Sequence, residues 1–555
     1  MHLFVKFCNM KKFFIENKFL VLLWGITILG LFIFVGHYSG ILIDFGREVY
    51  YPQEILNGKI LYKDLFNIYG PLAYQFNAVL YKIFGIKLST LYGAGIFTSL
   101  LTVSGIYLIA QKFLSKFLSF AIGFFTIAIG VTATSIFNFH FPYSWAVMYG
   151  LTAFLYSLYF LLKYWDEKNT KNLYLSSFLA GIAITCKYDF LLYALIVFAI
   201  STKEKNWKAI VSFFIAPILS FGALFIQGLK IDSLVNSLLT TSLMAKSKTL
   251  IYFYQNSGIY FNPKAIFTDF ILFLKTAIPF GAILSGIYLF NKKKYVAIFL
   301  SVIGWILFLL LFSIKFAFGF LPILLMLLFI TELIKSKSEN KYDIKTIILA
   351  LSAIAVCAKV FWVMLLGSYG NYYVSISLVA LFAILFKYLP KNLEKVAGIY
   401  ILAMSLIIIL SNSFALKHEN NKVSTPIGTM HTSKAYAESS NELIKYIDQN
   451  TKKDDKIVIF PEGMTINFLT QRNADDYYNS LLPLYTETFG EEKIINHYKK
   501  NLPEFVIFNN LDMKDYYFRF ICQDYALEFC GFVQNNYKLQ TVIGDEFRYL
   551  IFKRK

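Results

Sequence analysis

Residues 292–312 read KKKYVAIFLSVIGWILFLLLF, and this stretch decides the fold class. Three lysines are followed by an uncharged apolar run, which is long enough to cross the hydrocarbon core of a bilayer as a helix. Lysines collect at the cytoplasmic ends of such spans. The stretch therefore predicts a transmembrane helix that begins on the cytoplasmic side.

The same pattern recurs along most of the chain. Of all residues, 57% are hydrophobic and 16% are charged, whereas soluble domains carry about 25% charged residues. The apolar runs predict a polytopic α-helical membrane protein with about 13 transmembrane helices. The expected spans lie near residues 19–35, 91–110, 118–136, 146–162, 174–186, 190–201, 209–228, 267–290, 296–312, 316–333, 346–366, 374–388 and 397–415.

Lysines indicate which way the chain crosses the membrane. The formal net charge of +19 would suggest nucleic-acid binding in a soluble protein. Here the lysines gather after the even-numbered spans, which places the N-terminus in the cytoplasm and, because the span count is odd, the C-terminus outside. Lys11, Lys12 and Lys18 precede the first run, and no small-residue cleavage site follows it, so we expect an uncleaved first span in a bacterial inner membrane.

This topology divides the chain into two parts. Residues 1–415 form the transmembrane part, with a first periplasmic loop at 39–90, and residues 416–555 form a soluble periplasmic domain. Its expected elements are β-rich runs at 456–460, 505–508 and 547–552, a helix that begins after Ser439 and Ser440, and a helix at 491–500. These elements predict a small α/β domain. Cys522 and Cys530 could form a disulfide there, or remain free thiols.

The first periplasmic loop holds the main candidates for chemistry. It begins with Asp44, and Arg47 and Glu48 follow within four residues. A helix starting here would place both carboxylates on one face, beside the guanidinium. This arrangement offers a general base at the membrane surface. The alternative is that Asp44 caps the helix and pairs with Arg47 without any catalytic role.

This loop resembles the first periplasmic loop of the GT-C glycosyltransferases, in particular family 39, which includes protein O-mannosyltransferases and lipid A aminoarabinose transferases. The shared features are the acidic residue after the first span, a Leu-x-Gly turn, a Pro-Leu segment and a closing Phe-Gly, found here at 44, 56–58, 71–72 and 84–85. The resemblance implies that Asp44 is the base that deprotonates or positions the acceptor hydroxyl. Phe45 stands where many members have a second acidic residue, which makes paired-acid chemistry and a metal site less expected, although Glu48 could substitute.

Basic residues near the outer surface are candidates for binding a donor phosphate. Arg47 is one and Lys187 is the other, since it follows the run at 174–186 on the outer side. For Lys187, an ion pair with Asp189 at a turn is the alternative. Lys315 is expected only to extend its ammonium group toward the membrane surface.

Three more residues are candidates for substrate contact: Tyr69 in the first loop, His140 in a short outer loop, and Tyr372 near another outer end. An interfacial aromatic belt explains such residues equally well. No HExxH motif or comparable ligand spacing is present, so no metal site is predicted, while the need for a divalent ion stays open.

Two further outer segments have alternative interpretations. Residues 230–267 suit either a mobile loop that closes over a donor or a static interfacial helix. Residues 460–464 follow an expected strand and could bind the acceptor, or form a structural turn.

Together these features predict a membrane glycosyltransferase. The resemblance implies a polyprenyl-phosphate hexose or pentose as the donor, and the acceptor is expected to be a glycan, a lipid or a protein side chain. The main alternative is a transporter or flippase for lipid-linked sugars, which should carry charges at the middle of several spans or broken helices in repeated halves. Neither feature is evident in the sequence. A structural protein without chemistry would leave Asp44 replaceable.

Overall fold

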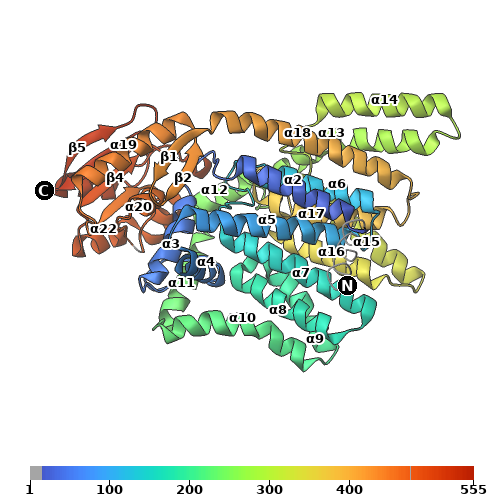
Figure 1. Cartoon of the computed structure of the whole chain (residues 1–555), viewed down its shortest axis with the longest axis horizontal. Helices are drawn as coiled ribbons and strands as arrows, with labels where there is room; N and C mark the ends of the chain where they lie inside the picture. The colour runs from blue at the N-terminus through green and yellow to red at the C-terminus, as the bar shows by residue number, and fades with distance from the viewer. Residues whose placement is uncertain (1–15, 476) are drawn as a thin grey trace, which may run out of the picture.

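The computed structural model describes residues 16–475 and 477–555, so Cys8, Lys11 and Lys12 lie outside the described residues. A bundle of helices occupies one end of the molecule and a smaller domain with a β-sheet occupies the other (Figure 1). Among the described residues, six helices are long and apolar enough to cross a membrane. Together with the composition, they identify an integral membrane protein.

Each predicted apolar run coincides with a helix of the bundle. These helices are α2 (Lys18–Phe34), α5 (Leu88–Ala110), α6 (Lys116–Thr126) with its continuation η1 (Ile127–Val131), α7 (Trp145–Glu167), α8 (Thr170–Cys186), α9 (Leu191–Lys203), α10 (Trp207–Ile226), α13 (Pro263–Leu289), α14 (Lys294–Leu311), α15 (Leu321–Ser338), α16 (Ile344–Val356), α17 (Val374–Leu385) and α18 (Leu393–His418). Several are shorter than a full span, so the count of 13 remains a prediction.

One predicted span is wrong in its second half. The apolar run at 346–366 was expected to be one helix, but α16 ends at Val356 and a short turn, η3 (Ala358–Val360), follows it. Lys359 lies in this turn, and its Nζ lies 3.8 Å from Oδ2 of Asp189. Because the residues on both sides of the turn are hydrophobic, the sequence gives no local sign that the helix is broken here.

The segment at 39–90, predicted to be the first periplasmic loop and called the first outer loop below, folds into two helices, α3 (Phe45–Leu56) and α4 (Leu72–Phe84). Both are followed by glycines with positive φ, Gly58 at +90° and Gly85 at +92°, which L-residues adopt only with strain. The Leu-x-Gly and Phe-Gly patterns of the sequence therefore mark real helix ends.

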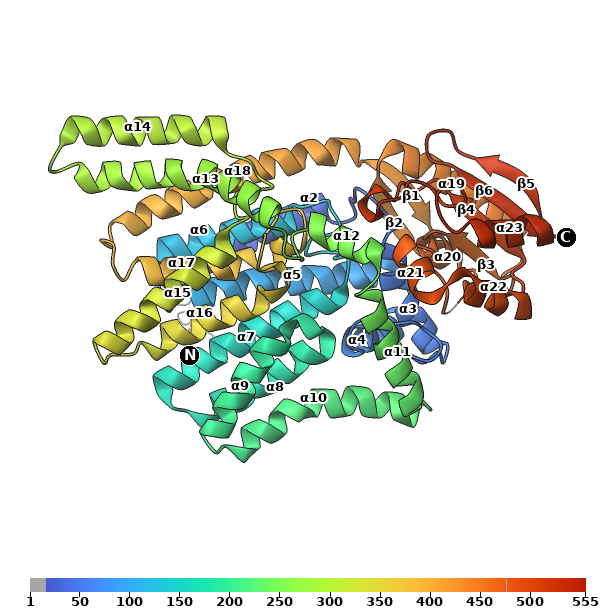
Figure 2. The ribbon, with the colours of Figure 1, turned by 180° about the vertical axis from the view of Figure 1, so that it is seen from behind.

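The outer segment between α10 and α13 also contains helices, α11 (Ile231–Met244) and α12 (Lys248–Asn256). Figure 2 shows them running from α10 toward the smaller domain, where α12 packs against α21 (Pro483–Phe489). Glu487 of α21 fastens the start of α12, because its carboxylate accepts bonds from the backbone N–H groups of Lys248 and Thr249 at 2.7 and 3.0 Å.

The C-terminal domain contains a four-stranded sheet in the order β3-β4-β6-β5. Only β3 and β4 pair in parallel; the other neighbours are antiparallel. The elements of the domain are the hairpin β1 (Asn421–Thr425) and β2 (Gly428–Thr432), α19 (Lys434–Asn450), β3 (Ile457–Phe460), α20 (Met464–Thr470), α21, α22 (Glu491–Lys500), β4 (Phe505–Asn509), η5 (Lys514–Tyr516), α23 (Leu527–Asn536), β5 (Tyr537–Ile543) and β6 (Tyr549–Arg554).

The predicted α/β character of this domain is confirmed, with one wrong boundary. The expected strands correspond to β3, β4 and β6, and α22 has the predicted bounds. The helix expected to begin after Ser440 instead begins at Lys434, and Ser439 and Ser440 are buried inside it. Cys522 and Cys530 form a disulfide, so the free-thiol alternative is wrong.

The C-terminal domain and the first outer loop share one hydrophobic core. Helix α3 packs against α20, and Gly46 permits the approach. A Cβ atom at Gly46 would stand 2.6 Å from the backbone nitrogen of Thr465. The hydroxyl of Thr465 in turn donates to the carbonyl of Ile41. The domain is therefore built onto the loop that carries Asp44.

Candidate active site

A polar cavity of about 210 Å³ lies where the first outer loop, the turns after α8 and α16, and the C-terminal domain meet. Four residues singled out in the sequence line it: Asp44, Arg47, Tyr69 and Lys187. Segments from distant parts of the chain contribute to one site, which a sequence alone cannot show.

Asp44 stands at the start of α3 with φ at +59°, an unusual conformation for a residue with a side chain. Its side chain makes no capping bond to the helix, so the capping part of the alternative interpretation is wrong, while the expected pairing with Arg47 is present. Its Oδ1 accepts a hydrogen bond from Nη2 of Arg47 at 2.8 Å, and 24% of the side chain is exposed. The carboxylate is therefore oriented by one guanidinium and is open to the cavity.

Glu48 contacts Arg47 but does not line the cavity. Its side chain is fully buried and accepts bonds from the Tyr74 hydroxyl at 2.7 Å, the Trp145 backbone N–H at 2.8 Å and Nε of Arg47 at 3.2 Å. Burial raises the pKa of Glu48, and Arg47 opposes this rise. The structure thus corrects the expectation of a second catalytic carboxylate: Glu48 positions Arg47.

Lys187 contributes a second cation to the cavity, and Lys359, which the sequence reasoning missed, contributes a third. Asp189 lies between the two ammonium groups, with Oδ2 at 3.5 Å from Nζ of Lys187 and 3.8 Å from Nζ of Lys359. The hydroxyl of Tyr373 donates to the same carboxylate at 3.1 Å. Asp189 therefore fixes both lysines while leaving their charges directed at the cavity.

Tyrosine rings separate the cations. The Tyr69 ring centroid lies 5.2 Å from Cζ of Arg47 and 4.7 Å from Nζ of Lys187, so this ring contacts both charges. Nζ of Lys359 lies 4.0 Å from the Tyr369 ring centroid. Lys187 also donates to the Tyr143 hydroxyl. The faces of these rings contact the basic groups and stand between them.

His140 and Tyr372 do not line the cavity, contrary to expectation. His140 is fully buried, with Nε2 at 3.2 Å from the carbonyl oxygen of Ala133. Tyr372 is also buried, and its ring stacks on Phe139 at a centroid distance of 5.8 Å. Both residues therefore pack beneath the site, although Nδ1 of His140 and the hydroxyl of Tyr372 have no hydrogen-bond partner among the described residues.

Glu462 joins the site from the C-terminal domain. Its Oε2 accepts a hydrogen bond from the backbone N–H of Asp44 at 2.8 Å, and only 5% of the residue is exposed. The side-chain amide of Asn509 donates to the carbonyl of Glu462 at 2.9 Å and fixes this turn. Burial, reinforced by the nearby Asp44 carboxylate, raises the pKa of Glu462 to about 7. The sequence suggested only a turn or an acceptor loop here.

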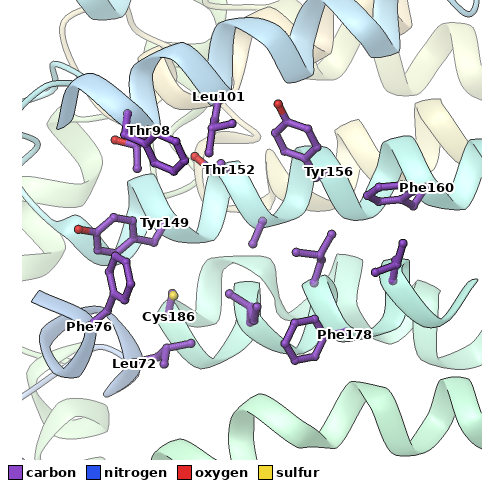
Figure 3. Close-up of a pocket in the computed structure, with 15 residues that line it drawn as sticks. Leu72, Phe76, Thr98, Leu101, Tyr149, Thr152, Tyr156, Phe160, Phe178 and Cys186 are labelled. Atoms are coloured by element: carbon purple, nitrogen blue, oxygen red, sulfur yellow. The ribbon is translucent and has the colours of Figure 1, made fainter. Parts of the chain in front are cut away.

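An apolar groove of about 620 Å³ runs between α4, α5, α7 and α8. Figure 3 shows Leu101 of α5 and Tyr156 of α7 on one side of it, with Phe178 and Cys186 of α8 on the other. Cys186 lines this groove and the next residue, Lys187, lines the polar cavity. Adjacent residues at the end of α8 therefore line the groove and the cavity.

Among residues 16–475 and 477–555, no group of three or more His, Cys, Asp or Glu side chains is arranged to hold a metal ion. The titratable side chains that line the cavity are two carboxylates, Asp44 and Asp189, three basic groups and several tyrosines.

No family model and no curated protein sequence matches this chain. Its structure is similar to that of ArnT from Cupriavidus metallidurans bound to undecaprenyl phosphate, with a TM-score of 0.45 and 10% identity over 97% of this chain and 98% of that chain. It is also similar to the oligosaccharyltransferase of Archaeoglobus fulgidus tethered to an acceptor peptide, with a TM-score of 0.46 and 12% identity over 95% of this chain and 73% of that chain. Both proteins are GT-C superfamily members, the superfamily that the first loop resembles. At these TM-scores the similarity decides nothing about the reaction, which must follow from the residues of the cavity.

Proposed function

We propose that this protein is a membrane glycosyltransferase that moves a sugar from a polyprenyl-phosphate donor to a hydroxyl acceptor on the extracytoplasmic side. One observation carries the proposal: a partly exposed Asp44 carboxylate, oriented by Arg47, faces a cavity that Lys187 and Lys359 also line. A carboxylate that can take a proton thus lies beside cations that can bind a phosphate.

The charges of the cavity fit such a donor. Three basic side chains, those of Arg47, Lys187 and Lys359, line the cavity together with two carboxylates, Asp44 and Asp189. Burial lowers the pKa of Lys187 to about 7, and Arg47 and Lys359 carry the fixed positive charges. A sugar attached to polyprenyl phosphate is a phosphodiester with one negative charge. When the sugar leaves, the phosphate gains a second charge, and fixed cations stabilise this charge as it develops.

The proposed step is a single displacement. The acceptor hydroxyl gives its proton to a carboxylate oxygen of Asp44, and its oxygen bonds to the anomeric carbon of the sugar. The bond from this carbon to the phosphate oxygen breaks, and its electron pair leaves with polyprenyl phosphate. Arg47, which contacts Asp44 and is fixed by Glu48, holds the base beside the developing phosphate charge.

The apolar groove supports a lipid-linked donor. A polyprenyl chain needs an apolar surface, and the groove offers one whose lining reaches Cys186, the residue before Lys187. A donor whose tail lies along α7 and α8 would bring its phosphate to the cations of the cavity. A transporter would not need a base next to these cations.

The test is transfer of label from membrane polyprenyl-phosphate sugars to endogenous acceptors, comparing the wild type with Asp44→Asn at equal protein levels. Removal of a general base lowers such rates about 100- to 10,000-fold. Asp232→Asn is the matched control, because Asp232 is an exposed aspartate of α11 outside the cavity. Unchanged transfer by Asp44→Asn would overturn the role of Asp44, and no transfer by the wild type would favour the transporter.

A further inference from the structure

A second cavity, of about 770 Å³, lies outside the membrane part, between α12, α21 and the loop that precedes α23. We call it the outer cavity. Its lining includes Tyr252, Tyr517 and Tyr525, and carboxylates at Glu487, Glu491, Asp524 and Glu528. None of these residues belongs to the polar cavity around Asp44.

A wall of aromatic residues separates the two cavities. Two adjacent residues of α12, Tyr252 and Phe253, each form a ring pair across this wall. Their partners are two adjacent residues at the end of η5, Tyr517 and Tyr516. Phe253 stacks on Tyr516 at 5.1 Å and both line the polar cavity, while Tyr252 meets Tyr517 edge to face at 5.4 Å and both line the outer cavity. The outer cavity is therefore one side chain away from the proposed reaction site.

The loop that forms the far side of the outer cavity is held firmly. The disulfide between Cys522 and Cys530 closes the segment that contains Asp524, Tyr525 and Glu528. Asp524 accepts bonds from two backbone N–H groups, those of Arg519 at 2.8 Å and Phe520 at 3.2 Å. The shape of this side thus exists before any ligand arrives, as in most small-molecule sites.

The aromatic lining is unusually exposed for a surface outside the membrane. The side chain of Tyr517 is 74% exposed, and Leu527 and Tyr252 beside the cavity are also exposed. Exposed apolar groups that gather at a concave surface mark a binding site rather than a random surface. The hydroxyl of Tyr525 is buried without a protein hydrogen-bond partner, so this lining also has an unused polar group.

The charges and hydrogen-bonding groups of the lining indicate which class of ligand the outer cavity binds. Carboxylates only accept hydrogen bonds, and four of them stand against one ammonium group, that of Lys248. Glu487, Glu491 and Asp524 already accept backbone N–H bonds, but their charges and that of Glu528 keep the lining negative. The ligand must therefore not be an anion, and it should carry donors for the remaining acceptor positions, above all those of Glu528. Sugar rings meet both demands, because their C–H faces pack on aromatic rings and their hydroxyl or amino groups donate to carboxylates.

We propose that the outer cavity binds a neutral or amine-bearing saccharide as the distal part of the acceptor. This inference rests on the proposed transferase function, and it narrows the acceptor from glycan, lipid or protein to a glycan. A peptide fits less well, since its backbone carries as many acceptors as donors and the lining offers few N–H groups.

The test uses the full-length protein in lipid nanodiscs and three probes: cellohexaose, a glucosamine hexamer and a galacturonic acid hexamer. Saturation-transfer NMR and titration should detect the first two and not the third. Tyr517→Ala should weaken binding about five-fold by removing one stacking face, and Glu528→Gln should weaken the amine-bearing probe more than the neutral one. Tyr295→Ala is the matched control, because this tyrosine of α14 is 88% exposed and lies outside the cavity.

Absence of binding by all three probes, equal binding of the galacturonic acid hexamer, or equal loss in Tyr295→Ala would overturn the proposal. So would displacement of the bound hexamer by an unglycosylated hexapeptide. Binding needs no donor, so its outcome is independent of the transfer assay. If the saccharides bind and transfer fails, the transferase function is wrong while the saccharide site stands.

Discussion

Glu462 accepts a hydrogen bond from the backbone N–H of Asp44 at 2.8 Å, although 418 residues separate them in the chain. Asp44 has φ at +59°, where a residue with a side chain is strained. The bond holds Asp44 in this conformation, and the conformation directs its carboxylate at the cavity. The C-terminal domain is therefore a structural part of the proposed active site.

Replacing Glu462 with alanine should lower transfer about ten-fold, because an unsatisfied backbone N–H costs about 1–3 kcal/mol and frees Asp44 to leave its strained conformation. Glu462→Gln keeps an oxygen that can accept the bond and should retain most of the activity. Steady-state kinetics in nanodiscs measure both. A positioning role predicts a fall in kcat with little change in donor KM, whereas equal activity of the two variants would contradict it.

The raised pKa of Glu462 makes stability depend on pH. Its folded pKa of about 7 lies above the ordinary value of 4.5, so the folded state favours the protonated form. The stabilisation is fully present below pH 4.5 and is lost as pH rises through about 7. Glu462→Gln removes this titration and should become more stable than the wild type by on the order of 1–3 kcal/mol above pH 7. Melting temperatures between pH 5 and 8 measure the difference; a difference that stays constant with pH would exclude Glu462 as its source.

Lys359 should be needed to bind the phosphate of the donor. Lys359→Met removes one of three cations but leaves Asp189 paired with Lys187, so the fold should survive. The affinity for polyprenyl phosphate should fall about ten-fold or more, as expected for a lost charge contact in a partly buried site. Lys315→Met is the control, because Lys315 is exposed and does not line the cavity. Equal affinities of the two variants would remove Lys359 from the site.

The sequence predicted those features that depend on local patterns. Apolar runs and lysines located the helices, and the position after the first span identified Asp44. Lys359 was missed because it sits within an apolar run, where a break in the helix leaves no local signal. Glu462 was not connected with Asp44 because no spacing rule relates residues so distant in the chain. Glu48 was assigned to catalysis because residue spacing does not report burial, and burial places it behind Arg47.

The apolar groove predicts a dependence on the length of the lipid. Leu101 lines the groove, and Leu101→Trp would fill part of its volume without touching the polar cavity. Donors with a long polyprenyl tail should then bind about ten-fold more weakly, since several buried methylene groups lose their contacts. Donors with two isoprene units would not extend along the groove and should keep their KM. Leu410→Trp is the matched control, because this leucine of α18 is exposed and lies outside the groove. An equal rise in KM for short and long donors would mean that the tail lies elsewhere on the membrane face of the protein.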